Sequence, residues 1–553
     1  MTKVEMRSRL PLAVFASVAI LASLALPNMG RAQVAGQHDP SQDFLTSDRC
    51  FTCHNNLKTP KGEDVSIGLE WRAGIMANSA RDPYWQGSVR REALDHPESS
   101  AAIQTECASC HMPLQYLQDK AQNRETELFK RLPLQTNHAA DAATADGVSC
   151  AVCHQIQSTG LGTSATYNGN VVVAPPGANP RPVFGPFALV SPDKVTPVHV
   201  MTTGYTPTQS DHIREAGLCG SCHTLSTVAR GPDDKQIGQL PEQMTYLEWQ
   251  HSDYRDKQTC QQCHMPVVAE PVAVSTVLGQ PREGVHHHSF VGANFLMEGI
   301  LSTHRDELAV TSQPSELAAS AARITSFLQA QSARVTMGSA QLAAGQLTFP
   351  VRVENLTGHK LPTAFPSRRA WLHVVVTAAD GHVVFESGKL NPDGSIAGNE
   401  NDADSTHYSP HFTRIMRSDQ VQIFEPILGD AQGHVTTGLL AATQYLKDNR
   451  ILPAGFDKTT AGRDIAVQGE AAADPDFTAG SSTTHYVIST NGASGPFRIA
   501  AELVYQPVGY RWAHNLASYQ ADETQRFVHY YQQAAAHSAV VLGHAETAVI
   551  ADP

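Results

Sequence analysis

The chain has 553 residues, of which 41% are hydrophobic, and a formal net charge of -13 at pH 7. This length exceeds what one hydrophobic core usually serves, so at least two domains are predicted. The negative charge argues against nucleic acid or an anionic membrane surface as a partner.

The first 32 residues have the pattern of a signal peptide. Basic residues at positions 3, 7 and 9 precede an apolar run over 11–26, and Gly30-Arg31-Ala32 offers small residues for cleavage. The apolar run is shorter than the roughly 20 residues that span a bilayer, and no later stretch is apolar enough to do so. We therefore expect a mature protein that begins near Gln33, has no membrane span, and is exported, most simply to a bacterial periplasm.

Five copies of one short motif follow. Each has the form Cys-x-x-Cys-His, and together they use all 10 cysteines of the chain. In chain order they are motif 1 (Cys50, Cys53, His54), motif 2 (Cys107, Cys110, His111), motif 3 (Cys150, Cys153, His154), motif 4 (Cys219, Cys222, His223) and motif 5 (Cys260, Cys263, His264). No cysteine is left over for a disulfide or for a nucleophilic thiol.

The motif is typical of covalent haem c attachment, in which two thioethers hold the porphyrin and the adjacent imidazole binds the iron. Paired Cys-x-x-Cys knuckles also form zinc sites, but zinc does not need a histidine after each pair, and five pairs cannot be shared out into complete four-thiolate sites. A redox dithiol would need one motif near a βαβ unit. The sequence therefore predicts five covalently bound haem c groups.

The segment 33–310 is predicted to form a pentahaem cytochrome domain. It is punctuated by Pro and Gly, and helical patterns are short, over 85–94 and 117–132. Because porphyrins are large apolar discs, they would supply much of the core that the polypeptide lacks.

The remaining chain changes from a helical to a strand pattern. A helix over 315–330 is expected within a linker at 311–334. Alternating patterns predict strands over 347–353, 370–376, 382–386, 483–489 and 497–505, with Asp380-Gly381 as a hairpin turn. These give an antiparallel β-sandwich over 335–515, then a helical tail over 516–553 with its helix near 521–537. The predicted fold class is α+β.

Each iron needs a second axial ligand or keeps an open site, and this choice separates an electron carrier from an enzyme. The haem region has ten histidines outside the motifs, enough for bis-histidine ligation throughout. The preferred candidates, chosen because they lie shortly before a motif or on alternate positions of the run 286–288, are His96, His138, His212, His286 and His288.

One histidine lies far outside the haem region. His359 occupies a loop punctuated by Gly358 and Pro362, and Arg368 and Arg369 follow. This segment could reach back to a haem or its propionates and lock the two domains together, or it could be an ordinary polar loop.

Two details carry a resemblance to a known family. Cys-His-Met-Pro occurs at 110–113 and again at 263–266, and the stretch 71–85 reads WRAGIMANSARDPYW. Over about 45–300 the chain resembles multihaem cytochromes of the cytochrome c-554 (cytochrome c-552/4) family. The resemblance implies electron transfer through closely stacked haems. The chain departs from that family in its long β-domain and in having five motifs instead of four.

Three functions are compatible with these features. The leading interpretation is a periplasmic cytochrome that carries electrons between redox partners, such as a quinol-linked donor and a periplasmic or outer-membrane cytochrome. The alternative is a multihaem oxidoreductase with one open-site haem, acting on a small nitrogen or sulfur compound. A third is a docking role for the β-domain, and a homo-oligomer is left open.

Overall fold

The computed structural model describes residues 44–135, 141–231 and 233–549. All of them belong to one compact unit that spans His38–Pro553. The mixture of helices and small, mainly antiparallel sheets makes the protein α+β, as predicted. The predicted signal peptide over 1–32, as well as His38 and His138, lies outside the described residues.

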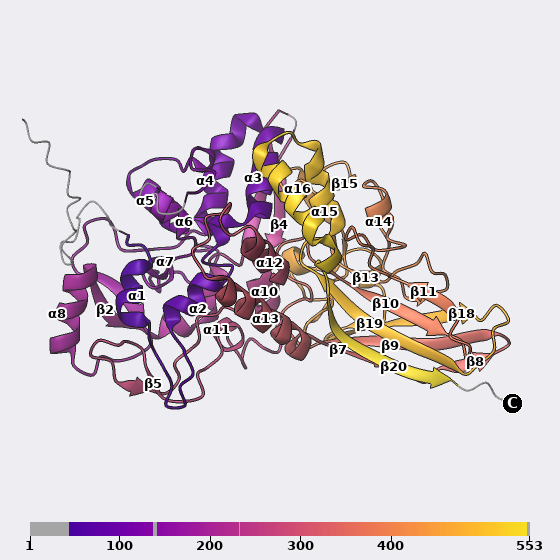
Figure 1. Cartoon of the computed structure of the whole chain (residues 1–553). Helices are drawn as coiled ribbons and strands as arrows, with labels where there is room; N and C mark the ends of the chain where they lie inside the picture. The colour runs from indigo at the N-terminus through magenta and orange to yellow at the C-terminus, as the bar shows by residue number, and fades with distance from the viewer. Residues whose placement is uncertain (1–43, 136–140, 232, 550–553) are drawn as a thin grey trace, which may run out of the picture. The chain divides into compact units, whose positions relative to one another are not determined.

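Residues 44–310, here called the N-terminal half, contain many short helices and few strands (Figure 1). The helices are α1 (Asp48–His54), α2 (Ile67–Ala73), α3 (Pro83–Asp95), α4 (Ser100–His111), α5 (Pro113–Ala121), α6 (Ala142–Ala145), α7 (Cys150–Cys153), α8 (Pro192–Thr203), α9 (Ala216–Gly220), α10 (Thr245–Gln250), α11 (Cys260–His264) and α12 (Phe295–Thr303). The strands are β1 (Arg181–Gly185), β2 (Tyr205–Gln209), β3 (Leu225–Arg230), β4 (Gln236–Gln243), β5 (Val272–Ala273) and β6 (Pro281–Arg282), and they form three two-stranded sheets.

Local chemistry explains where the predicted helices begin and end. The Asp82 carboxylate accepts hydrogen bonds from the backbone N–H groups of Tyr84 (2.8 Å) and Trp85 (3.1 Å), and Pro83 occupies the first turn, so α3 begins there. This confirms the helix expected over 85–94. The helix expected over 117–132 is wrong, because α5 ends at Ala121 and Asn123 takes a positive φ of 53°, which a continuing helix cannot contain.

Residues 311–549, the C-terminal half, begin with α13 (Pro314–Gln331), which confirms the connecting helix. Two larger sheets follow. One has the order β11-β10-β19-β20, with β13 also paired to β10, and the other has the order β12-β18-β9-β7, with β17 and β8 at its sides. Their strands are β7 (Ala333–Met337), β8 (Gln341–Ala343), β9 (Gln346–Asn355), β10 (Arg369–Thr377), β11 (Val383–Ser387), β12 (Arg414–Ile415), β13 (Ile423–Phe424), β17 (Phe477–Thr478), β18 (Ser481–Ser489), β19 (Phe497–Gln506) and β20 (Val540–Val549).

The two sheets bury their side chains in one hydrophobic cluster. Val351 and Val353 of β9 contribute from one sheet, and Val374, Val376 and Ile499 contribute from the other. A separate three-stranded sheet consists of β14 (Pro426–Asp430), β15 (Val435–Thr436) and β16 (Ala442–Asp448), and short helices α14 (Glu400–Ala403) and α15 (Tyr510–His514) lie in the connections. All five strands expected from alternating patterns are confirmed.

The helical tail predicted over 516–553 needs correction. Helix α16 (Asp522–Ala534) is present, but residues 540–549 form β20, which pairs antiparallel with β19. Val540 and Val541 favour a strand, and the neighbouring strand β19 offers backbone partners that a sequence pattern does not reveal. The chain therefore returns from the helix to the sheet.

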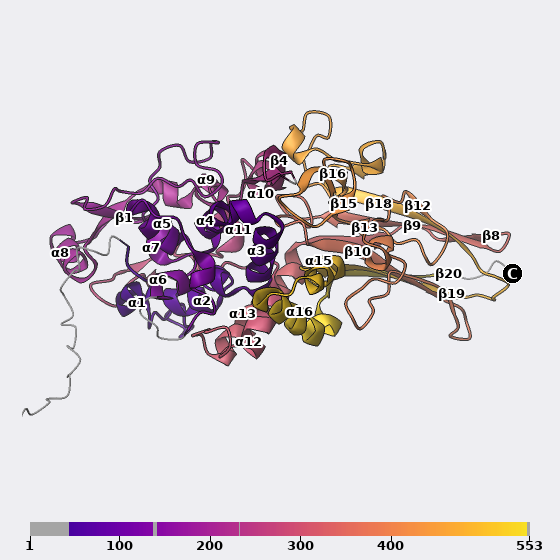
Figure 2. The same cartoon turned by 90° about the horizontal axis from the view of Figure 1, so that it is seen from above.

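The two halves pack closely against each other. Helix α16 lies against α3 and α12, and β16 lies beside β4 (Figures 1 and 2). Phe527 of α16 is fully buried, and its ring centroid is 4.9 Å from that of Tyr84 in α3. In the described part of the chain, no helix combines the length and apolar character needed to cross a membrane.

Candidate cofactor-binding cavity

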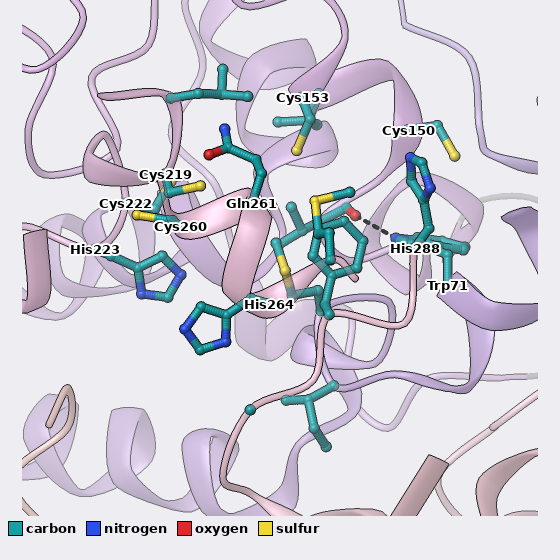
Figure 3. A pocket seen from close by; sticks show the side chains of 18 of the residues that line it. Trp71, Cys150, Cys153, Cys219, Cys222, His223, Cys260, Gln261, His264 and His288 are labelled. Carbon is teal, nitrogen blue, oxygen red and sulfur yellow. Dashed lines mark hydrogen bonds between the residues drawn. The ribbon is translucent and has the colours of Figure 1, made fainter. Parts of the chain in front are cut away.

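The five motifs of the N-terminal half surround one continuous cavity, which residues of the C-terminal half also line. Its volume is about 1160 Å³, and all ten motif cysteines and all five motif histidines line it. None of these ten cysteines is paired in a disulfide. Figure 3 shows His223 and His264 facing the same space, with Cys219, Cys222 and Cys260 beside them. Five motifs that are far apart in the sequence therefore meet at one cavity in the folded protein.

Each motif is carried by a short helix that gives its side chains a common direction. Motif 1 lies in α1, motif 2 ends α4, motif 3 spans α7, motif 4 follows from α9, and motif 5 is α11. Because positions i, i+3 and i+4 share one helix face, both thiols and the imidazole point to the same side. This is the arrangement that one porphyrin attached through two thioethers and one imidazole requires.

The motif imidazoles are oriented by backbone carbonyls. The Nδ1 atoms of His54, His154 and His264 each lie 2.6 Å from a carbonyl oxygen, belonging to Val274, Phe184 and Val291 respectively. A ring that donates from Nδ1 presents Nε2 as a free electron pair, which is the usual state of a metal-bound histidine. Burial lowers the pKa of His111 and His223 to about 4, so both imidazoles are neutral near pH 7.

Four histidines outside the motifs also line the cavity: His199, His286, His288 and His359. They share the orientation of the motif imidazoles. Nδ1 of His199 lies 2.9 Å from the carbonyl of Tyr205, and Nδ1 of His359 lies 2.9 Å from that of Lys360. His288 bonds to the carbonyl of His286, and His286 bonds to that of Met265. Each therefore has Nε2 free for a metal.

Two ring pairs have a separation that would suit two ligands of a single iron. The centroids of His154 and His288 are 6.4 Å apart with an interplanar angle of 16°, and those of His264 and His359 are 6.3 Å apart at 12°. A metal–imidazole bond is about 2.0 Å long and the ring centroid lies roughly 1.2 Å behind the bound nitrogen, so opposite ligands should have centroids about 6.4 Å apart. Both separations match this value.

The other histidines predicted as ligands have different surroundings. His212 is buried, but Nδ1 lies 2.6 Å from the Ser210 hydroxyl and Nε2 lies 2.8 Å from the carbonyl of Ile156, so neither nitrogen is free for an iron. His96 is buried 3.5 Å from a carboxylate oxygen of Asp234 and is not among the residues that line the cavity. These contacts do not favour His212 or His96 as ligands, and both stay predictions, while His138 falls outside the described residues.

Sequence reasoning gave no preference to His199 and weighed His359 without choosing it. His199 lies on α8, which contacts α1 of motif 1, and it acts electrostatically on His54. His359 belongs to the C-terminal half. The Gly and Pro residues around His359 were the signal that could have found it, whereas the sequence around His199 offers none.

Neighbouring motifs touch through their cysteines. The thiols act on one another's pKa between motifs 1 and 3 (Cys50 with Cys150), between motifs 2 and 4 (Cys110 with Cys222), and between motifs 4 and 5 (Cys219 with Cys260), so these cysteines are neighbours in space. Cys153 of motif 3 also acts electrostatically on both cysteines of motif 4. The spatial order is therefore 1, 3, 4 and 5, with motif 2 attached at the side of motif 4.

The motifs differ in their access to the surface. Between the two cysteines, Thr52 of motif 1 and Gln262 of motif 5 are exposed. The corresponding residues of motifs 2, 3 and 4 are buried: Ala108, Ser109, Ala151, Val152, Gly220 and Ser221. The two ends of the order 1, 3, 4, 5 are thus the motifs that reach the surface.

The charged side chains that line the cavity are acidic near motif 2 and basic near motifs 4 and 5. Around Cys107 of motif 2, burial raises the pKa of three carboxyls, those of Glu92, Glu106 and Glu242, the last to about 7. Near motifs 4 and 5 the wall carries the guanidinium of Arg368, which acts on His223, His264 and His359.

The residues that line the cavity suit haem c. Each of the five thiol pairs lies beside an imidazole, and further imidazoles lie at the ligand separation from two of these, His154 and His264. The wall is largely apolar, as the residues Trp71, Val183, Phe290 and Phe327 illustrate. The residues present fit the group that the motifs imply.

Comparisons with known proteins add one finding. No known protein family matches the chain, and no curated protein matches it. Among solved structures, the chain is similar to a penta-heme cytochrome c552 from Thermochromatium tepidum, with 16% sequence identity over 93% of this chain and 100% of that chain and a TM-score of 0.49.

Proposed function

We propose that the protein is an exported pentahaem c-type cytochrome that carries electrons between redox partners. When bound, haem c supplies one-electron redox chemistry. The residues that would hold it are the five cysteine pairs and, as axial ligands, His54, His111, His154, His223 and His264. His199, His286, His288 and His359 are proposed as ligands on the opposite faces.

The observation that carries this proposal is the pair of opposed imidazoles, His154 with His288 and His264 with His359. An iron with two protein ligands has no position for a substrate. Both ligands are fixed through their Nδ1 hydrogen bonds, so the site needs little rearrangement when its charge changes. Such a site favours electron transfer over catalysis.

The order of the sites supports separate places for a donor and an acceptor. Motifs 1 and 5 reach the surface at opposite ends of the contact series, and motifs 3 and 4 connect them within the protein. We propose that redox partners, such as a quinol-linked donor and a periplasmic or outer-membrane cytochrome, approach these two motifs. The net charge of -13, to which propionates would add, suits partners with a positive contact surface.

The signal peptide over 1–32 remains a prediction, and export to a periplasm is proposed on that basis together with the haem motifs. Mass spectrometry of the secreted protein would locate its first residue, expected near Gln33.

The test is a haem count combined with a carbon monoxide titration of the reduced protein. We expect five haems per chain from the pyridine haemochrome and carbon monoxide uptake by at most one of them, because a six-coordinate iron does not admit the gas and four histidines outside the motifs line the cavity. A count below five would contradict the assignment of the motifs. Uptake of carbon monoxide by several haems would contradict the proposed function as an electron carrier.

A second candidate function is a multihaem oxidoreductase acting on a small nitrogen or sulfur compound, with its open site at motif 2. The ring contact of His111 is with Trp85, stacked at 4.5 Å, instead of with a second imidazole. Burial raises the pKa of Glu242 to about 7, which would let this side chain donate a proton near neutral pH. Two cations of the same region are already engaged, because Arg72 pairs with Glu316 and Arg81 donates to the carbonyl of Ala309. Uptake of one equivalent of carbon monoxide would favour this function.

A further inference from the structure

Four charged side chains form a buried series between the two halves. Lys360 Nζ lies 2.6 Å from Asp448 Oδ2, and Arg450 holds Asp448 through two contacts of 2.8 Å. Nη1 of Arg450 then lies 3.0 Å from Oε1 of Glu248 in α10. All four side chains are buried, those of Lys360 and Glu248 completely. The series contains two cations and two anions, so its charges balance.

The series ends on the loop that carries His359. Oε2 of Glu248 accepts the backbone N–H of Lys360 (3.1 Å) and the hydroxyl of Thr363 (2.5 Å). Lys360 directly follows His359, and its carbonyl is the group that orients the His359 ring. One carboxylate of the N-terminal half therefore fixes the loop on the C-terminal side of His359.

The other side of the loop also rests on the N-terminal half. The Tyr254 hydroxyl donates to the carbonyl of Leu356 (2.9 Å). A Cβ at Gly358 would lie 3.1 Å from Cβ of Tyr254 and 3.2 Å from the ring of Trp249, so the backbone approaches both side chains closely. His359 is thus placed by contacts on both of its sides.

A buried network of charges is a costly way to join two surfaces. Removing ions from water costs free energy that their mutual attraction often only balances, and apolar side chains of similar volume would stabilise the interface at least as well. Charged side chains with fixed partners hold the chain in one geometry. Here they hold the ring centroids of His264 and His359 6.3 Å apart.

We propose that Glu248 and Arg450 are positioning residues for His359, and that they make the C-terminal half the donor of the sixth ligand at motif 5. This inference rests on the proposed ligation of that iron by His264 and His359. The new element is the role of Glu248 and Arg450. Neither would touch the iron, yet together they would decide whether His359 occupies the sixth position at motif 5 or leaves it to small ligands.

The test uses the full-length holoprotein with a charge-balanced change, Glu248→Gln together with Arg450→Met, which leaves the pair Lys360–Asp448 in place. We expect five haems per chain and one equivalent of carbon monoxide bound in addition to that of the unaltered protein. The low-spin signal of one ferric haem should be lost in electron paramagnetic resonance. The matched control is Arg369→Met with Asp402→Asn, a buried pair within the C-terminal half at 2.8 Å, which should leave both readouts unchanged.

His359→Gly separates this inference from the ligation on which it depends. It should also admit one further equivalent of carbon monoxide, and added imidazole should restore the low-spin signal. If His359→Gly has this effect and the double variant does not, the positioning role is overturned while the ligation stands. If His359→Gly has no effect, the ligation at motif 5 is overturned.

Thr363→Val covers the case in which the double variant does not take up five haems. It removes the hydrogen bond from the hydroxyl to Glu248 and no charge. We expect partial carbon monoxide binding at one haem, with five haems retained. Wild-type behaviour of Thr363→Val in that case would overturn the proposal.

Discussion

The guanidinium of Arg368 faces three of the imidazoles that line the cavity. Its Nη1 donates to the carbonyl of Thr363 (3.2 Å), and its charge acts on His223, His264 and His359. A fixed positive charge stabilises a site that gains an electron. With haem bound at motifs 4 and 5 as proposed, Arg368 would raise their reduction potentials, in addition to any part in binding propionates.

Arg368→Gln should lower the reduction potentials of two of the five haems, by roughly tens of millivolts, because a nearby cation is lost. Spectroelectrochemical titration measures this directly. Arg417→Gln is the control, since Arg417 is exposed and paired with Asp419. Potentials that stay the same in both variants would show that the Arg368 charge is screened.

Glu298 of α12 gives the protein a pH-dependent stability. Burial raises the pKa of its carboxyl to about 8, while the Ser320 hydroxyl donates to it at 2.8 Å. Between the ordinary carboxyl value of about 4.3 and that value, the folded protein keeps a proton that the unfolded chain releases. Raising the pH through this range therefore reduces the free energy of unfolding.

Glu298→Gln should abolish the fall in the free energy of unfolding that the parent protein shows as the pH rises. We expect equal stability of variant and parent near pH 5, and a variant that is more stable at pH 9 by on the order of a few kcal/mol. Denaturant unfolding at both pH values measures the difference. The exposed Glu283→Gln should show no such divergence. Parallel curves for Glu298→Gln and its parent would contradict a buried neutral carboxyl.

Sequence identified the cavity residues that are defined by local spacing and missed those that are defined by the fold. The five motifs can be recognised from neighbouring residues alone. The carbonyl that orients His54 belongs to Val274, and the imidazole opposite His264 belongs to His359. Such contacts join residues far apart in the chain, so no local pattern separates His359, which faces the cavity, from His212, whose two nitrogens are occupied.

Among the elements, α16 is the helix whose packing most clearly joins the halves. Phe527 is fully buried between Tyr84 and Tyr531. Removing a buried aromatic ring leaves a cavity that the surrounding side chains fill only in part. The face of α3 that α16 covers would then lose its packing.

Phe527→Ala should destabilise the protein by about 3 to 5 kcal/mol, as expected for loss of a large buried side chain. Thermal or denaturant unfolding of the holoprotein measures this. Gln532→Ala, an exposed position of the same helix, is the control and should have little effect. A small effect at Phe527 would mean that the α16–α3 contact is not part of the cooperative core.

Strands with strictly alternating apolar and polar residues could be predicted from the sequence. Elements that form because a neighbouring strand offers backbone partners could not. Leu347, Phe349, Val351 and Val353 are buried on one face of β9, as the pattern required. In β20 the positions 543–548 carry Gly, His, Glu and Thr, so the pairing with β19 has no comparable signal. The helix expected over 117–132 failed for a different reason, because Asn123 takes a positive φ just after α5, a conformation that asparagine tolerates at helix ends.

For the whole molecule, contacts across the halves predict a single unfolding transition. Arg90 holds Glu523 through two bonds of 2.8 Å, and the Tyr445 hydroxyl donates to the carbonyl of Pro241 (2.7 Å). The sequence predicted separate domains at 33–310 and 335–515. We expect them to unfold together, because the interface contains buried side chains from both.

Circular dichroism in the Soret band follows the haem sites, and the far-ultraviolet signal near 218 nm follows the sheets. The two signals should change at one denaturant concentration. Two separated transitions would show that the C-terminal half is an independent domain, and in that case the sixth ligand of motif 5 would be lost before the haems are released.

The position of His359 late in the chain has a consequence for how the protein is made. If the chain is exported and ligated as proposed, its motifs would reach the haem attachment apparatus from the N-terminus onward, and motif 5 would be complete while residues 311–549 are still arriving. His359 could then bind beside motif 5 only after β9 and the segment that contains Arg450 have folded. Maturation of this site would therefore be the final step of biogenesis.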